Sequence, residues 1–161
     1  MAKDKTVTTN AMRILDRMKI SYQMLSYECS DFQDAGVTAD KLNLEHERVY
    51  KTLVTMGHSK NYYVFVIPID QELDLKAAAK AVQEKSVEMI HVKDITAVTG
   101  YIRGGCTAIG MKKEYVTRID VSAQQYPTIH VSAGKIGAQI EIAPSDLAKV
   151  AKAEFAAICV K

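Results

Sequence analysis

The feature that most constrains the fold is a pair of apolar runs, residues 49–56 and 62–67, separated by a short turn sequence. Both runs are rich in β-branched and aromatic residues, and the first alternates with the period of two that is typical of a strand. Residues 57–61 read Gly-His-Ser-Lys-Asn, which is turn chemistry. The two runs therefore predict a β-hairpin with a loop of four or five residues.

Shorter segments on both sides of this hairpin carry local signals for helices and strands. Cap-type residues precede three of the predicted helices: Thr9 the first, Thr38 the second and Asp74 the third. Because the strands do not alternate regularly with the helices, the sequence predicts one α+β domain over residues 1–161. The predicted helices are residues 11–19, 39–42, 75–84, 95–99 and 144–153, and the further strands are residues 20–27, 87–90, 116–121, 128–132, 139–142 and 155–160.

Charge and cysteine usage exclude several classes of protein. With 21 Lys and Arg against 19 Asp and Glu, the net charge is only +2, so any contact with nucleic acid has to be local. Cys29, Cys106 and Cys159 form no C-x-x-C pair, which fits neither a disulfide framework nor a zinc knuckle. The first ten residues lack the apolar run expected of a signal peptide, and the longest apolar run, residues 62–69, is too short to span a bilayer. We therefore expect a soluble, cytoplasmic protein with no membrane partner.

Residues 100–110 contain four of the eight glycines and are a candidate ligand-binding loop. Gly105 and Gly110 have the spacing of a phosphate-binding Walker loop, but Met111 stands where that loop needs lysine, so the motif is ruled out. What remains is the pair Gly104 and Gly105, whose backbone a ligand can approach because no side chain is in the way. An ordinary tight turn explains the same residues.

Lys51 differs most from its surroundings, because it lies in an apolar strand and shares a face with Val49 and Leu53. A lysine on a core-facing side is partly desolvated, and such amines act as acid/base groups or bind electron-rich substrates. A long side chain that reaches solvent at a sheet edge is the competing structural explanation.

A predicted turn brings together a hydroxyl, backbone N–H groups and a cation, at Ser132, Gly134 and Lys135. Such a turn can receive a carbonyl or a phosphate. Between residues 100 and 140, five basic residues stand against two acidic ones, which suits the phosphate-bearing end of a nucleic acid and equally a solvated rim. The four histidines show no metal-ligand spacing and lie in no nucleophile motif.

Taken together, these motifs resemble those of one family. Residues 49–53 (Val-Tyr-Lys-Thr-Leu), 100–105 (Gly-Tyr-Ile-Arg-Gly-Gly) and 129–135 (Ile-His-Val-Ser-Ala-Gly-Lys) are similar, in order and spacing, to three motifs of the YbaK/EbsC family of prolyl-tRNA editing domains. The likeness covers nearly the whole chain, and within the family it is strongest to the free-standing deacylases of Cys-tRNA(Pro).

The resemblance implies a mixed, barrel-like β-sheet flanked by helices. It implies an enzyme that hydrolyses the ester between a mischarged amino acid and the 3′ end of tRNA(Pro), with prolyl-tRNA synthetase as a transient partner. For a cysteinyl ester it implies that the substrate's own thiol attacks the carbonyl and releases a cyclic thiolactone. Neither a metal nor an organic cofactor is implied.

The resemblance also implies which residues form the site. Lys51 matches the pocket lysine, Gly104 the glycine whose backbone faces the ester, and Ser132 the serine of the third motif, so these are the expected catalytic residues. The expected substrate-binding residues are Tyr27, Thr52, Gly105, Gly134 and Lys135.

The chain departs from the family beside the predicted pocket, where amino-acid preference is set. Ala133 replaces a glycine of the third motif, Cys106 stands where an aliphatic residue is usual, and the loop at residues 29–36 is shorter. Two alternatives therefore stay open. One is a deacylase of Ala-tRNA(Pro) or another small aminoacyl-tRNA that uses water, and the other is a tRNA-binding or regulatory module without turnover.

Overall fold

The computed structural model describes residues 9–27 and 35–160, so the prediction about Cys29 lies outside the described residues. The helices are α1 (Asn10–Arg17), α2 (Ala35–Lys41), α3 (Leu75–Ala81), α4 (Ile95–Thr99) and α5 (Pro144–Ala151), with short 3-10 helices η2 (His46–Arg48), η3 (Val92–Asp94) and η4 (Val121–Gln125). The strands are β1 (Gln23–Ser26), β2 (Tyr50–Gly57), β3 (Tyr62–Pro68), β4 (Val87–Met89), β5 (Val116–Asp120), β6 (Ile129–Ser132), β7 (Ala138–Ile142) and β8 (Glu154–Ala156).

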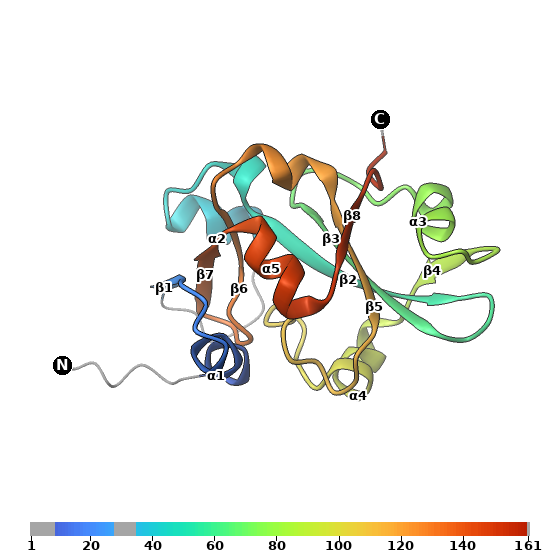
Figure 1. Cartoon of the computed structure of the whole chain (residues 1–161), viewed down its shortest axis with the longest axis horizontal. Coiled ribbons are helices and arrows are strands. Elements are labelled where there is room, and N and C mark those ends of the chain that lie inside the picture. The colour runs from blue at the N-terminus through green and yellow to red at the C-terminus, as the bar shows by residue number, and fades with distance from the viewer. Residues whose placement is uncertain (1–8, 28–34, 161) are drawn as a thin grey trace.

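The predicted hairpin is confirmed and forms the centre of the larger sheet. β2 and β3 pair antiparallel, with Tyr50 opposite Pro68 and Met56 opposite Tyr62. The five-stranded sheet has the order β4-β2-β3-β5-β8, and β5 runs parallel to both of its neighbours. The smaller sheet, β1-β7-β6, is antiparallel and lies to the left of the hairpin in Figure 1. The α+β class is thus confirmed, with the strands divided between two sheets.

A β-bridge between Val49 and His130 brings the start of β2 beside β6 and so connects the two sheets. A core of buried side chains from both sheets, α1 and α5 fills the space between them, including Leu15, Ile119, Ile140 and Leu147. This junction gives the molecule the barrel-like character that the resemblance implies, because β6 lies beside the start of β2 and links the smaller sheet to the larger one.

Side-chain caps determine where two helices begin. Thr9 Oγ1 accepts a hydrogen bond from the Met12 N–H at 3.1 Å and donates to the Ala133 carbonyl at 2.6 Å, so it also ties α1 to the turn after β6. Asp74 caps α3 through the N–H groups of residues 76 and 77. α3 then packs on the other face of the hairpin, over Phe65 and Ile67.

The structure corrects some of the predicted boundaries. Thr38 does not cap the second helix but lies within α2, where its side chain is buried. α3 ends at Ala81, before the predicted residue 84, because Gln83 adopts a left-handed φ of 60° that no helix continues. Strand β8 ends at Ala156. No helix in the described part of the chain is both long enough and apolar enough to cross a bilayer.

Candidate active site

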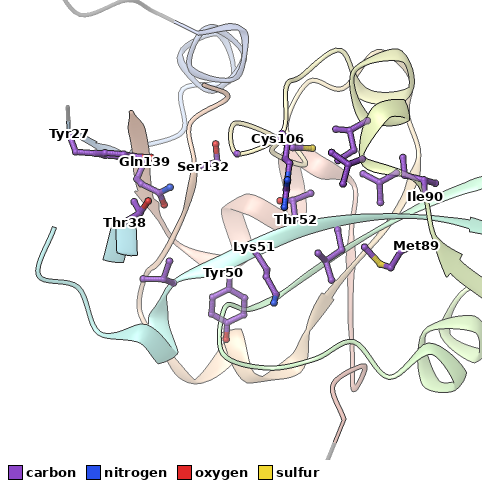
Figure 2. Close-up of a pocket in the computed structure, with 17 residues that line it drawn as sticks. Tyr27, Thr38, Tyr50, Lys51, Thr52, Met89, Ile90, Cys106, Ser132 and Gln139 are labelled. Atoms are coloured by element: carbon purple, nitrogen blue, oxygen red, sulfur yellow. The ribbon is translucent and has the colours of Figure 1, made fainter. Parts of the chain in front are cut away.

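A pocket of about 360 Å³ lies against β2, between the two sheets and the glycine-rich loop (Figure 2). Its walls come from segments far apart in the sequence: β2, the end of β4 with η3 and α4, the loop at residues 103–106, the facing strands β6 and β7, and α2. The pocket therefore exists only because the hairpin and the smaller sheet meet.

The floor of the pocket is a stretch of β2 whose outer edge lacks a partner strand. β4 pairs with β2 only at residues 55–57, and within the described residues no strand pairs with this edge over residues 50–54. At this edge the Val54 carbonyl accepts from the Ile90 N–H at 3.2 Å. Because alternate residues of a strand direct their N–H and C=O to the same edge, the backbone groups of Thr52 point toward the pocket.

The glycine loop presents backbone to the pocket at Gly104. This residue is exposed, lines the pocket and has a φ of 87°, a conformation that residues with a side chain rarely adopt. Among the described residues, nothing accepts a hydrogen bond from the N–H of Gly104 or of Cys106. Two donors are therefore available beside the pocket for a developing negative charge.

Gly105 and Lys135, predicted to bind substrate, do not line the pocket but contact each other. A Cβ atom at Gly105 would lie 2.8 Å from the Cα of Lys135, so only glycine allows the loop to rest on the turn after β6. Gly134, with a φ of 103°, lies behind the pocket against Tyr101. These three residues support the site rather than face it.

Ser132 and Tyr27 both line the pocket. The Ser132 Oγ accepts a hydrogen bond from the Gly134 N–H at 3.2 Å, which leaves the hydroxyl proton available to a ligand. Tyr27 lines the far end of the pocket, and its backbone N–H is held by the Gly137 carbonyl at 2.9 Å.

Lys51 also borders the pocket, but its amine points away from the pocket, toward the Ile69 carbonyl. Its Nζ donates to the Ile69 carbonyl at 3.2 Å, and the register places the side chain on the face of Ile67, opposite to that of Thr52. Figure 2 shows the amine on the other side of β2 from Ser132 and Cys106. To contact a ligand, the amine has to leave Ile69 and turn around the open edge of β2.

The described lining residues include no aspartate, glutamate or histidine. Cys106 is the cysteine in the lining, and burial raises the pKa of its thiol to about 11, so the thiol is protonated near neutral pH. His130 lies outside the lining, and burial lowers its pKa. The pocket therefore offers hydrogen bonds and positive charge but neither a general base nor a thiolate.

Sequence reasoning missed several residues of the pocket. Gln139 and Thr38 form its polar end, near Tyr27 (Figure 2). Only the strand pairing predicts Gln139, because it lies directly opposite Ser132 across β6 and β7. The other end is apolar and is made by Met89, Ile90, Val92 and Ile95.

Comparison with known proteins agrees with this fold. The aminoacyl-tRNA editing domain family matches residues 29–150, and the chain belongs to that family. Over its whole length the chain is 49% identical to an Enterococcus faecalis protein named "Putative Cys-tRNA(Pro)/Cys-tRNA(Cys) deacylase EbsC", of which it covers 99%.

Two solved structures share the fold at lower identity. One is described as "a putative trans-editing enzyme for prolyl tRNA synthetase" (TM-score 0.81, 19% identity, covering 97% of this chain and 100% of that one). The other is a hypothetical protein (TM-score 0.84, 18% identity, covering 92% and 97%). The family, the fold and the pocket together define an aminoacyl-tRNA deacylase.

Proposed function

We propose that the protein deacylates Cys-tRNA(Pro), and that the thiol of the cysteinyl group is the nucleophile. The observation that carries this proposal is a pocket whose described lining has no aspartate, glutamate or histidine and whose cysteine is protonated. The described lining therefore offers water no carboxylate or imidazole to take its proton. It suits a substrate that brings its own nucleophile, and the name of the 49% identical relative supports cysteine.

The proposed reaction is an intramolecular acyl transfer. A cysteine thiol has a pKa of about 8.5, so a few per cent is thiolate near pH 7. The thiolate sulfur forms a bond to the ester carbonyl carbon, and the carbonyl oxygen takes the negative charge. When the tetrahedral intermediate collapses, the C–O bond to the ribose breaks, the ribose oxygen takes up a proton, and cysteine leaves as a cyclic thiolactone that water then opens.

The described residues have distinct roles in this reaction. The N–H groups of Gly104 and Cys106 bind the oxyanion, and the backbone of Thr52 orients the ester along the open edge of β2. The Ser132 hydroxyl donates to the ribose. The Lys51 amine turns from Ile69 into the pocket when an ester is bound and stabilises the oxyanion together with these N–H groups. The single hydrogen bond it gives up is worth only about 1 kcal/mol.

The proposed partners are the acceptor end of mischarged tRNA(Pro) and, transiently, prolyl-tRNA synthetase, in the cytoplasm. A net charge of +2 favours a local contact with tRNA over a long one. Selection of tRNA(Pro) would then depend on the synthetase.

Single-turnover deacylation of three substrates tests the proposal: Cys-tRNA(Pro), Ala-tRNA(Pro) and S-methylcysteinyl-tRNA(Pro). We expect rapid loss of cysteine only, because alanine and the methylated thioether have no nucleophile. Equal loss of alanine would assign the protein to the deacylases that use water. If all three esters persist while the tRNA still binds, the protein is a binding module.

A further inference from the structure

Gln139 stands out among the pocket residues that the proposed reaction does not use. It lies on β7 directly opposite Ser132 on β6, so both side chains project from the same face of the smaller sheet. Figure 2 shows its carboxamide between Tyr27 and Thr38 at the polar end of the pocket. The side chain is only 9% exposed.

One atom of the Gln139 carboxamide, the acceptor Oε1, is buried without a partner among the described residues. Buried polar side-chain atoms in native proteins nearly always have a partner, so an unpaired acceptor beside a cavity indicates a group that arrives with a ligand. A half-turn of the carboxamide exchanges Oε1 and Nε2 within the same shape, so the acceptor can be turned toward the pocket.

The chemistry of the pocket indicates which ligand group this is. An aminoacyl ester carries an α-ammonium group, which can only donate hydrogen bonds and needs an acceptor. The described lining lacks a carboxylate, so the acceptors it offers are neutral. Ser132 already accepts from the Gly134 N–H, and among the described residues of the lining the carboxamide oxygen of Gln139 is the buried side-chain acceptor without a partner.

We propose that Gln139 accepts a hydrogen bond from the α-ammonium group of the aminoacyl ester and thereby determines that the substrate is an α-amino acid. This inference rests on the proposed function, and it leaves the Ser132 hydroxyl for the ribose. The thiol and the ester are then held between Gln139 and the glycine loop.

The test compares Cys-tRNA(Pro) with 3-mercaptopropionyl-tRNA(Pro), which keeps the thiol and lacks only the α-amino group. For wild type we expect kcat/KM to be at least tenfold higher with the cysteinyl substrate. In Gln139→Leu this preference falls to less than twofold, because only the cysteinyl rate drops. Gln139→Glu keeps an acceptor and retains the preference, and thermal unfolding shows that both variants are folded.

An unchanged preference in a folded Gln139→Leu protein would overturn the inference, and so would an equal drop for both substrates. A wild type that cleaves neither ester would instead contradict the proposed function. Calorimetry then decides the inference separately, with cysteine joined by an amide to 3′-amino-3′-deoxyadenosine and the same compound without its α-amino group. Tighter binding of the amine-bearing compound that Gln139→Leu abolishes supports the contact, and equal affinities refute it.

Discussion

Two cavities lie on different sides of the protein, and the difference between them is how their polar groups are satisfied. The larger one, about 480 Å³, is lined by His46, Asp70, Asp120 and Cys159 among others. Two of its ionisable groups are well partnered: Asp120 accepts from the N–H groups of residues 122 and 158, and His46 lies between Asp40 at 2.8 Å and Asp70 at 3.0 Å.

The pocket beside β2 is smaller and has fewer ionisable groups, yet its polar groups are open. Within the described part of the chain, Thr52 directs backbone groups to an unpaired edge, the N–H of Gly104 has no acceptor, and the Gln139 Oε1 has no donor. The comparison indicates that unsatisfied hydrogen-bonding capacity, rather than volume or the number of charges, marks the site for a ligand.

The largest effect is expected for Lys51→Ala. We expect deacylation of Cys-tRNA(Pro) to fall about 100-fold, the scale seen when one group that stabilises an oxyanion is removed. Stability should change little, because the amine is partly exposed and makes one hydrogen bond at 3.2 Å. Single-turnover rates with Lys76→Ala, at an exposed position on α3, give the matched control. Near-normal turnover by folded Lys51→Ala would remove this residue from the mechanism.

Gly105→Ala tests the contact between the two loops. Its new Cβ would meet the Lys135 backbone at 2.8 Å, and overpacking of this kind costs about 1–3 kcal/mol. We expect a lower free energy of unfolding in urea and slower deacylation, because Gly104 moves with its neighbour. Unchanged stability and rate would show that the loop does not depend on this contact.

Asp120→Ala tests the larger cavity, where Asp120 and His46 have hydrogen-bond partners. It leaves two buried N–H groups without their acceptor, so we expect a loss of about 2 kcal/mol in the free energy of unfolding. Deacylation by the folded fraction should stay within about twofold, because Asp120 does not line the pocket beside β2. A loss of turnover without a loss of stability would assign this cavity a functional role and contradict the comparison.

The smallest effect is expected for His46→Gln, and it is a change in melting temperature that depends on pH. Hydrogen bonds that the imidazole donates, chiefly to Asp40 and next to Asp70, raise the pKa of His46 above its ordinary 6.5. Because the pKa is raised on folding, the protonated imidazole stabilises the fold fully at pH values below the pKa that His46 has in the unfolded chain. This contribution is lost as the pH rises through the pKa that it has in the folded protein. The melting temperature of wild type should therefore exceed that of His46→Gln most at pH 6, with the difference shrinking toward pH 9. A constant difference would show that the charge does not matter.

Local signals were sufficient for much of the fold. The alternation of residues 49–56 and the turn at residues 57–61 predicted the hairpin, and caps such as Thr9 and Asp74 predicted where helices begin. These features depend on neighbours in the chain, so the sequence contains the information needed. Thr38 shows the limit, because a residue that is suitable as a cap is equally suitable as a buried polar side chain within a helix.

The sequence by itself determined the family, the motifs and the residue types of the site. Only the tertiary structure decided which of them face the ligand: it directed the Lys51 amine to Ile69, placed Gly105 against Lys135, and brought Gln139 opposite Ser132. Motifs report what each segment contains, whereas the direction of a side chain and its partners depend on strands that are far apart in the chain. The unpaired edge of β2 is the clearest example, since it exists only because β4 pairs with the far end of that strand and β6 meets its start.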